Sequence, residues 1–247
     1  MSQVVLVTGA SRGIGKGLVG HYLARPDTTV IATVRDTTSV TAKELGSLQK
    51  GDGSRIIIVE LIADNSHSAG TAAASIRTQH HIDHIDIVVA NAGICDHWGP
   101  IVEVAEQGVT SHFEVNVLGP LRLFQAMAPL LQKARSPKFI YISTLLASIG
   151  GIGKMFTLTG PYGMSKAAGN FFVRKIHAED DHLITLSIDP GLVQTDLGDR
   201  AAQYYGLEKA PVTLEACVRG IIAQIDAAEK STTSGSFVDI SGEKVAW

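Results

Sequence analysis

Short apolar runs alternate with longer, helix-compatible stretches from one end of the chain to the other. The apolar runs are rich in valine and isoleucine and nearly continuous, which is typical of strands covered on both faces. They are Val4–Val7, Thr29–Val34, Ile56–Leu61, Ile85–Ala90, Lys138–Ile142, Leu183–Ile188 and Ser236–Ile240. The helix-compatible stretches are Gly15–Arg25, His67–Gln79, Val109–Lys133, Tyr162–Ala178 and Leu214–Ala227. Because the two kinds of segment alternate, we expect an α/β protein with a doubly wound, seven-stranded parallel sheet.

Length and composition indicate a single domain. The chain has 247 residues, of which 45% are hydrophobic and 18% are charged. A chain of this length can bury one large core, and no linker, repeat or low-complexity segment divides it. We therefore expect residues 1–247 to form one domain. Crossovers of one hand then bring the loops that follow the strands to one edge of the sheet, where ligands bind.

Charge and cysteine content restrict the partners and the compartment. The formal net charge of −3 gives no basic surface for nucleic acid or an acidic membrane. Cys95 and Cys217 cannot make a disulfide framework, so a reducing compartment is expected. The N-terminus has no basic leader, and no apolar run approaches about 20 residues. We expect a cytoplasmic protein with neither nucleic-acid nor membrane partners.

A glycine-rich loop follows the first predicted strand and opens directly into a helix. Its glycines have the spacing G-x-x-x-G-x-G, and a P-loop is excluded because Gly17 stands where serine or threonine would hold magnesium. Small residues permit a tight turn, and the N–H groups of the helix N-terminus can bind a pyrophosphate. The residues predicted to bind it are Gly9, Ser11, Arg12, Gly13, Ile14 and Gly15.

The end of the second strand predicts which dinucleotide is preferred. Val34 occupies the place where an NAD-binding site usually carries a carboxylate for the ribose diol. Arg35 follows it, and together with Arg12 it could hold a 2′-phosphate, although Asp36 next door weakens that case. The pattern favours NADP(H) over NAD(H).

Five landmarks in order along the chain resemble those of the short-chain dehydrogenase/reductase family, and the resemblance covers essentially the whole length. The landmarks are Thr8–Gly15, Asn91-Ala92-Gly93, Asn116, Tyr162-Gly163-Met164-Ser165-Lys166, and Asp189-Pro190-Gly191 with Thr195. The resemblance implies a Rossmann-like domain that binds NAD(P) and also carries the catalytic helix. The Arg35-Asp36 pair and the terminal Trp247 are similar to the fungal ketoreductase and carbonyl reductase branch.

Tyr162 and Lys166 are four residues apart on a predicted helix, so both side chains lie on one face. A neighbouring ammonium favours the phenolate, and we therefore expect it to lower the tyrosine pKa from about 10. The family resemblance implies that Tyr162 gives a proton to the substrate oxygen and that Lys166 also holds the nicotinamide ribose. It further implies that Asn116 anchors a water linking Lys166 to solvent.

The hydroxyl that completes this set departs from the family pattern. The family's serine is usually the second of a Ser-Ser pair, and here the fifth strand ends in Ser143-Thr144. We take Thr144 as the catalytic hydroxyl, because it can still donate to a carbonyl oxygen, with Ser143 and Ser148 as alternatives.

The remaining cofactor contacts also follow from the resemblance. Asn91, Ala92 and Gly93 are expected under the adenine ribose. After the third strand Ile62 stands where many relatives have aspartate, so either Asp64 or apolar contact alone would hold the adenine. The residues expected at the nicotinamide carboxamide are Pro190, Gly191, Val193 and Thr195.

Two segments, 149–160 and 195–212, are expected to cover the substrate. With the loop after the fourth strand they supply the candidate substrate contacts, which are Ser143, Cys95, His97, Trp98, Met155, Phe156, Leu197, Tyr204 and Tyr205. Their apolar and aromatic character predicts a bulky, hydrophobic or aromatic carbonyl compound. The histidines His80, His81 and His84 lack a completing ligand set, and no metal site is expected.

These observations predict an NADPH-dependent oxidoreductase that reduces a ketone or aldehyde to an alcohol. The alternative is an NADP(H)-binding protein of the same fold used for regulation or for a non-redox reaction such as cyclisation. The long helices could build a homodimer or homotetramer.

Overall fold

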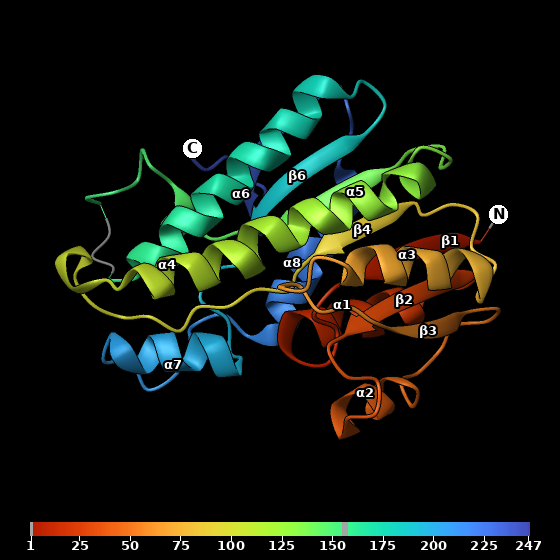
Figure 1. The fold of residues 1–247 in the computed structure, drawn as a ribbon, viewed down its shortest axis with the longest axis horizontal. Coiled ribbons are helices and arrows are strands. Elements are labelled where there is room, and N and C mark those ends of the chain that lie inside the picture. The colour runs from red at the N-terminus through yellow and green to blue at the C-terminus, as the bar shows by residue number, and fades with distance from the viewer. Residues whose placement is uncertain (1, 155–157) are drawn as a thin grey trace.

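One parallel sheet forms the centre of the structure, which is a computed structural model that describes residues 2–154 and 158–247 (Figure 1). Its seven strands are β1 (Gln3–Val7), β2 (Thr28–Val34), β3 (Arg55–Glu60), β4 (Ile87–Ala90), β5 (Lys138–Ile142), β6 (Ile184–Asp189) and β7 (Ser236–Asp239). They lie in the order β3-β2-β1-β4-β5-β6-β7, and every pairing among them is parallel. The predicted seven-stranded, doubly wound single domain is confirmed.

Helices cover both faces of this sheet (Figure 1). They are α1 (Gly13–Leu23), α2 (Val40–Leu45), α3 (Ser68–Thr78), α4 (Glu106–Phe113), α5 (Gly119–Leu131), α6 (Gly160–Glu179), α7 (Asp196–Tyr204) and α8 (Leu214–Ala227). Apolar side chains of α1 and α8 pack in one core cluster, and those of α3, α5 and α6 pack in another on the opposite face. Because both faces are covered, all seven residues of β2 are buried, which explains its unbroken apolar run.

The structure departs from the expected helices in three places. The stretch Val109–Lys133 is interrupted by a π-helix, Glu114–Leu118, which separates α4 from α5. The segment 195–212, expected to be a loop, contains the helix α7. α7 includes Gly198, a poor helix former, because a Cβ there would overlap the carbonyl group of Val193. The short helix α2 was likewise not predicted.

The chain reverses its direction of winding between β1 and β4, which are neighbours in the sheet. The loops that follow these two strands therefore separate and leave a crevice where ligands bind in such folds. Thr8, at the end of β1, joins the two loops, since its hydroxyl accepts hydrogen bonds from the amides of Asn91 and Ala92, each at 3.0 Å. In the described part of the chain no helix is long and apolar enough to cross a membrane.

Replacing Thr8 by valine should lower the free energy of unfolding by about 1–3 kcal/mol, because two amides lose their acceptor. Thr33→Val is the matched control. Thr33 is also buried on the sheet, but its hydroxyl has no partner among the described residues, so this change should be neutral or stabilising. Urea unfolding of both variants measures the difference. Equal losses would contradict the assigned role of the Thr8 hydroxyl.

Candidate active site

The loop between β1 and α1 has the shape of a phosphate cradle. Gly9 and Gly13 adopt left-handed backbone angles, with φ of 65° and 54°. A side chain at Gly15 would overlap the carbonyl oxygen of Gly9, so the turn closes only with glycine there. The first turn of α1 has no side-chain cap, which leaves its amides available to an anion. These residues fit the pyrophosphate of a dinucleotide, as the sequence predicts.

Other residues of the predicted cofactor set surround this cradle. Asn91, directly after β4, supports it, because its side-chain amide donates to the carbonyl of Thr8 at 2.8 Å. Ser11 and Ile14 are half-buried in the loop and the first turn of α1. Beyond β3, Ile62 is half-buried and Asp64 is exposed.

The two arginines expected at a 2′-phosphate do not share a partner in the structure. The guanidinium of Arg12 lies 2.7 Å from the carboxylate of Asp196, at the start of α7. Their side chains are 66% and 71% exposed, and such ion pairs contribute at most about 1 kcal/mol. Arg35 is exposed just after β2 and forms no ion pair with the described residues. Arg12 can therefore exchange Asp196 for a phosphate at little cost.

Helix α6 carries Tyr162 and Lys166 on one face, as predicted. Lys166 is buried, and its Nζ donates to the carbonyl of Ile142 at 2.7 Å. Nζ lies 5.8 Å from the centre of the Tyr162 ring. Burial lowers the pKa of Lys166 to about 7, so its charge changes in the physiological range.

The pKa of Tyr162 differs from the sequence-based expectation. Burial raises it above its ordinary value, with smaller contributions from Cys95 and Asp189, and only a hydrogen bond with Thr144 opposes the shift. The expected lowering by Lys166 is wrong for this structure, because burial dominates the balance and the ammonium is held against Ile142. Tyr162 is therefore a protonated phenol at neutral pH, which is the form that can donate a proton.

Three hydroxyls were candidates for the catalytic partner of Tyr162, and their contacts distinguish them. The hydroxyl of Thr144 accepts from the amide of Leu146 at 3.3 Å, and of the three it is the one that lies close enough to the Tyr162 phenol to lower its pKa. Ser143 is buried and donates to Oδ1 of Asn170 at 2.7 Å, so it packs against α6 and does not face substrate, contrary to expectation. Ser148 accepts from the amide of Gly151 at 3.0 Å and supports a turn.

Asn116 lies inside the π-helix and is completely buried. Its side chain accepts from the amide of Ile94 at 2.9 Å and donates to the carbonyl of Ile94 and to the hydroxyl of Ser165, both at 3.0 Å. The same Ser165 hydroxyl donates to the carbonyl of Tyr162 at 2.8 Å. Asn116 therefore connects the loop after β4 to the catalytic helix, and a π-helix at such a position is common at functional sites. Gly93 approaches both Asn116 and Lys166, where a Cβ would lie 3.1 and 3.4 Å from their polar atoms.

The loop after β6 leads to α7 and carries the residues expected at the nicotinamide. Pro190 and Val193 are buried, and Gly191 has a φ of 75°. The Thr195 hydroxyl donates to the carbonyl of Val193 and accepts from the amide of Gly198, which caps α7. One lone pair of this hydroxyl is left to accept a bond from a carboxamide.

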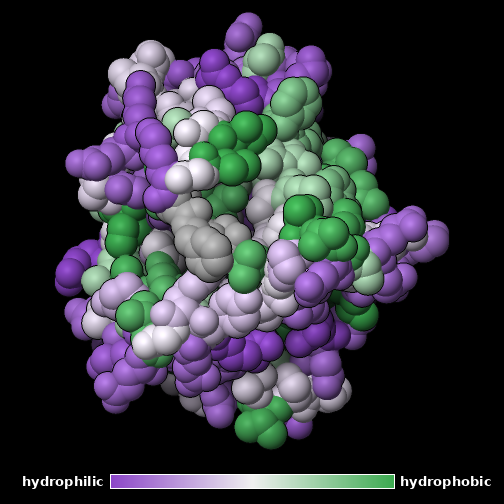
Figure 2. Space-filling view, turned by 90° about the vertical axis from the view of Figure 1, so that its left-hand side faces the viewer, coloured by the Kyte–Doolittle hydropathy of each residue, from purple (hydrophilic) through white to green (hydrophobic). Residues whose placement is uncertain are grey.

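Aromatic side chains from two separate segments, both predicted to face the substrate, meet beside α7. The ring centre of Trp98 lies 5.2 Å from that of Tyr204 and 6.4 Å from that of Tyr205, so the loop after β4 contacts α7. Leu197 is half-buried on the same helix. Figure 2 shows the end of the molecule that carries α4 and α7, where apolar patches gather within a hydrophilic border.

Other predicted substrate residues are placed differently. Cys95 is buried, and burial raises the pKa of its thiol to about 12, so it is a packing group and not a nucleophile. His97 has a buried Nε2 without a hydrogen-bond partner among the described residues. Met155 and Phe156 lie outside the described residues.

The sequence interpretation missed several side chains that hold the site together. Asp189 accepts from the amide of Leu145 at 2.8 Å and fixes the turn after Thr144. His112 is buried beside Tyr162, with ring centres 6.5 Å apart, and its Nε2 lies 3.3 Å from the Asp96 carboxylate. Asp189, the last residue of β6, belonged to one of the sequence landmarks but was given no role there, whereas a single histidine on a helix is usually a core residue.

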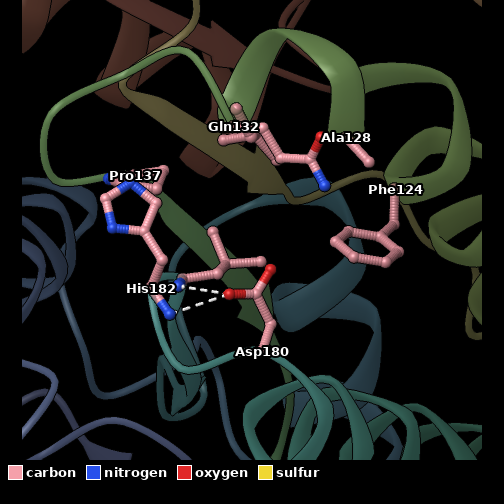
Figure 3. Close-up of a pocket in the computed structure, with 8 residues that line it drawn as sticks. Phe124, Ala128, Gln132, Pro137, Asp180 and His182 are labelled. Atoms are coloured by element: carbon pink, nitrogen blue, oxygen red, sulfur yellow. Dashed lines mark hydrogen bonds between the residues drawn. The ribbon is translucent and has the colours of Figure 1, made fainter.

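Two hollows elsewhere on the surface are weaker candidates for an active site than the residues described above. One of about 30 Å³ lies beside Phe124, Pro137 and His182, near the amino ends of β5 and β6, where Asp180 accepts two backbone amides (Figure 3). It has room for little more than water. A larger, open one of about 800 Å³ lies near His84, also at the amino ends of the strands. Among the described residues no group of three metal-ligating side chains is found.

Comparison with known proteins identifies the family of this chain. The sequence profile of a family described as short chain dehydrogenase matches residues 3–205. The chain belongs to the short-chain dehydrogenase family. It is therefore an oxidoreductase whose fold binds a nicotinamide cofactor, as the landmarks in its sequence predicted.

Individual members of the short-chain dehydrogenase family resemble the chain over nearly its whole length. The norsolorinic acid ketoreductase nor1 of Dothistroma septosporum is 43% identical over 98% of this chain and 91% of its own. That of Aspergillus parasiticus is 42% identical over 99% and 91%. Among solved structures, the NADPH-bound carbonyl reductase from chicken fatty liver is 28% identical, with a TM-score of 0.86 over 100% and 99% of the two chains. The carbonyl reductase Sniffer of D. melanogaster is 27% identical, with a TM-score of 0.84 over 100% of both chains.

The contacts of Thr144 and Ser143 predict that removing the first hydroxyl impairs turnover, whereas removing the second lowers stability. Thr144→Val should lower kcat/KM for carbonyl reduction about 100-fold, because one donor to the developing oxyanion is lost, and Thr144→Ser should restore most of it. Ser143→Ala should cost about 1 kcal/mol of stability and leave turnover nearly unchanged. Steady-state kinetics and urea unfolding measure both. A larger kinetic loss in Ser143→Ala than in Thr144→Val would reverse the assignment.

Proposed function

We propose that the protein reduces a ketone or aldehyde to an alcohol with NADPH as the hydride donor. The observation that carries this proposal is the convergence of Tyr162, Thr144 and Lys166 at the carboxyl ends of β5 and β6. The glycine cradle at the end of β1 borders the same edge of the sheet. A cofactor held by the cradle and by Lys166 would extend across this edge to the hydroxyl pair.

Each side chain has a distinct part in the reaction. Bound NADPH supplies the hydride. The Thr144 hydroxyl donates to the carbonyl oxygen and orients the substrate. The protonated Tyr162 phenol transfers its proton to that oxygen as negative charge develops on it. The Lys166 ammonium would hold the ribose hydroxyls of the bound cofactor, and it stabilises the tyrosinate that remains. Asn116 and Asp189 keep the loops on either side of Tyr162 in place.

The preference for NADP(H) rests on charge at the adenosine end of the cradle. Arg12 and Arg35 are both exposed. The end of β2 carries Val34, so no carboxylate stands at that position to repel a 2′-phosphate. The carbonyl reductase from chicken fatty liver, which shares the fold over the full chain, binds NADPH. Both observations support NADPH over NADH.

The substrate we propose is a bulky aromatic ketone. Trp98, Tyr204 and Tyr205 form an aromatic wall between the loop after β4 and α7. Such rings bind extended aromatic molecules through stacked or edge-on contacts. Two relatives above 40% identity are named as norsolorinic acid ketoreductases, which makes norsolorinic acid the first compound to test.

The test of this function follows NADPH oxidation by the purified protein with norsolorinic acid and a panel of simpler aromatic ketones. Tyr162→Phe should lower kcat by a factor of about 100 to 10,000, because the general acid is removed. NADPH binding, measured by fluorescence, should persist in the variant. Carbonyl-dependent turnover of Tyr162→Phe at the wild-type rate would refute the mechanism. NADPH binding without turnover of any carbonyl compound would instead indicate a regulatory or non-redox protein.

The cofactor preference is tested by binding of NADPH and NADH to three variants. Arg12→Ala and Arg35→Ala should each weaken NADPH binding about tenfold and leave NADH binding unchanged. Asp196→Ala releases Arg12 from its exposed ion pair and should strengthen NADPH binding by up to about fivefold. An unchanged ratio of the two affinities in Arg35→Ala would remove Arg35 from the 2′-phosphate site.

A further inference from the structure

Tyr141 occupies the space between the catalytic lysine and the π-helix. It lies on β5 three residues before Thr144 and is completely buried. The Nζ atom of Lys166 lies 4.5 Å from the centre of its ring, closer than to the ring of Tyr162. The Tyr141 hydroxyl donates to the main-chain carbonyl of Asn116 at 2.9 Å. A side chain at Gly169 on α6 would overlap this hydroxyl, so the helix is shaped to admit it.

The Lys166 ammonium has few other groups that favour its charge. Burial disfavours the charged form, and the titratable groups that face it are Tyr162 on its own helix, Tyr141 on β5 and Cys95 on the loop after β4. Burial raises the pKa of all three, so they are uncharged at neutral pH. The carbonyl of Ile142 is one partner, the π face of Tyr141 at 4.5 Å is the second, and the ring of Tyr162 lies farther away, at 5.8 Å. A desolvated ammonium is stabilised strongly by an aromatic face.

We propose that Tyr141 is a positioning residue of the active site, whose ring holds the Lys166 ammonium in place and whose hydroxyl holds the turn that carries Asn116. The inference rests on the proposed function, in which Lys166 binds the cofactor ribose and assists Tyr162. Through Tyr141, strand β5 contacts both Lys166 and the main chain of Asn116.

A core aromatic on the same strand separates this role from simple packing. Phe139 is also completely buried, two residues earlier and on the same face of β5. Its ring packs against Phe124 and Phe172, with centres 5.3 and 6.1 Å away. Among the described residues no cation lies over it. Phe139→Leu therefore removes a similar volume without touching Lys166.

The experiment measures the titration of Lys166 in the free protein by NMR of ¹³C-labelled lysine, with the signal assigned from Lys166→Arg. The wild-type midpoint is expected at about 7. In Tyr141→Leu it should fall by about one pH unit, because the charged form loses the π face. In Tyr141→Phe and Phe139→Leu it should stay near the wild-type value. If Tyr141→Leu does not fold, Tyr141→Met fills more of the cavity without a π face and serves in its place.

An unchanged midpoint in the Tyr141→Leu or Tyr141→Met variant would overturn the proposal, and so would an equal shift in Phe139→Leu. This titration requires no turnover, so its failure is distinct from a failure of the proposed function. Where reduction is measurable, the fall of kcat/KM at high pH should move to lower pH by the same amount in Tyr141→Leu. It should not move in Phe139→Leu, even if that variant melts at an equally reduced temperature.

Discussion

The rest of the site depends on the charge of one buried ammonium. Lys166 comes from the second turn of the long helix α6, and it is surrounded by the sheet, the π-helix and the loop after β4. A charge in such a place is costly unless polar or π partners surround it. The structure supplies a carbonyl from β5 and an aromatic face from the same strand, and it leaves room at Gly93. The burial that makes this charge costly also keeps Tyr162 protonated. The same burial therefore shifts the pKa values of both Lys166 and Tyr162.

Local patterns in the sequence were sufficient for the sheet and the phosphate cradle. Strands such as β2 and β6 are buried along their whole length, and this leaves an apolar run that can be recognised without knowledge of its neighbours. The turns at Gly9 and Gly13 require left-handed angles, which limits them to glycine in practice. Both signals are carried by a few consecutive residues.

Contacts between distant residues could not be predicted in the same way. Ser143 and Thr144 are adjacent, and only the position of α6 shows that one hydroxyl packs against Asn170 while the other reaches Tyr162. Arg12 meets Asp196 across 184 positions of the chain. The direction of the Tyr162 pKa shift also depends on burial, which the four-residue spacing from Lys166 does not reveal. The helix α7 escaped prediction because Gly198, needed for its close approach to Val193, weakens the local helix signal.

The π-helix at Glu114–Leu118 determines which side of the following helix, α5, faces the sheet. A π-turn adds one residue to a helix, and one residue corresponds to about 100° of rotation in an α-helix. With one residue fewer, the segment would close as a regular α-helix. Either Asn116 would then leave Ile94 and Ser165, or the apolar side of α5, with Leu123 and Met127, would turn away from the sheet. The number of residues between Asn116 and the apolar side of α5 is therefore as constrained as their identity. Insertions or deletions are tolerated only outside this segment.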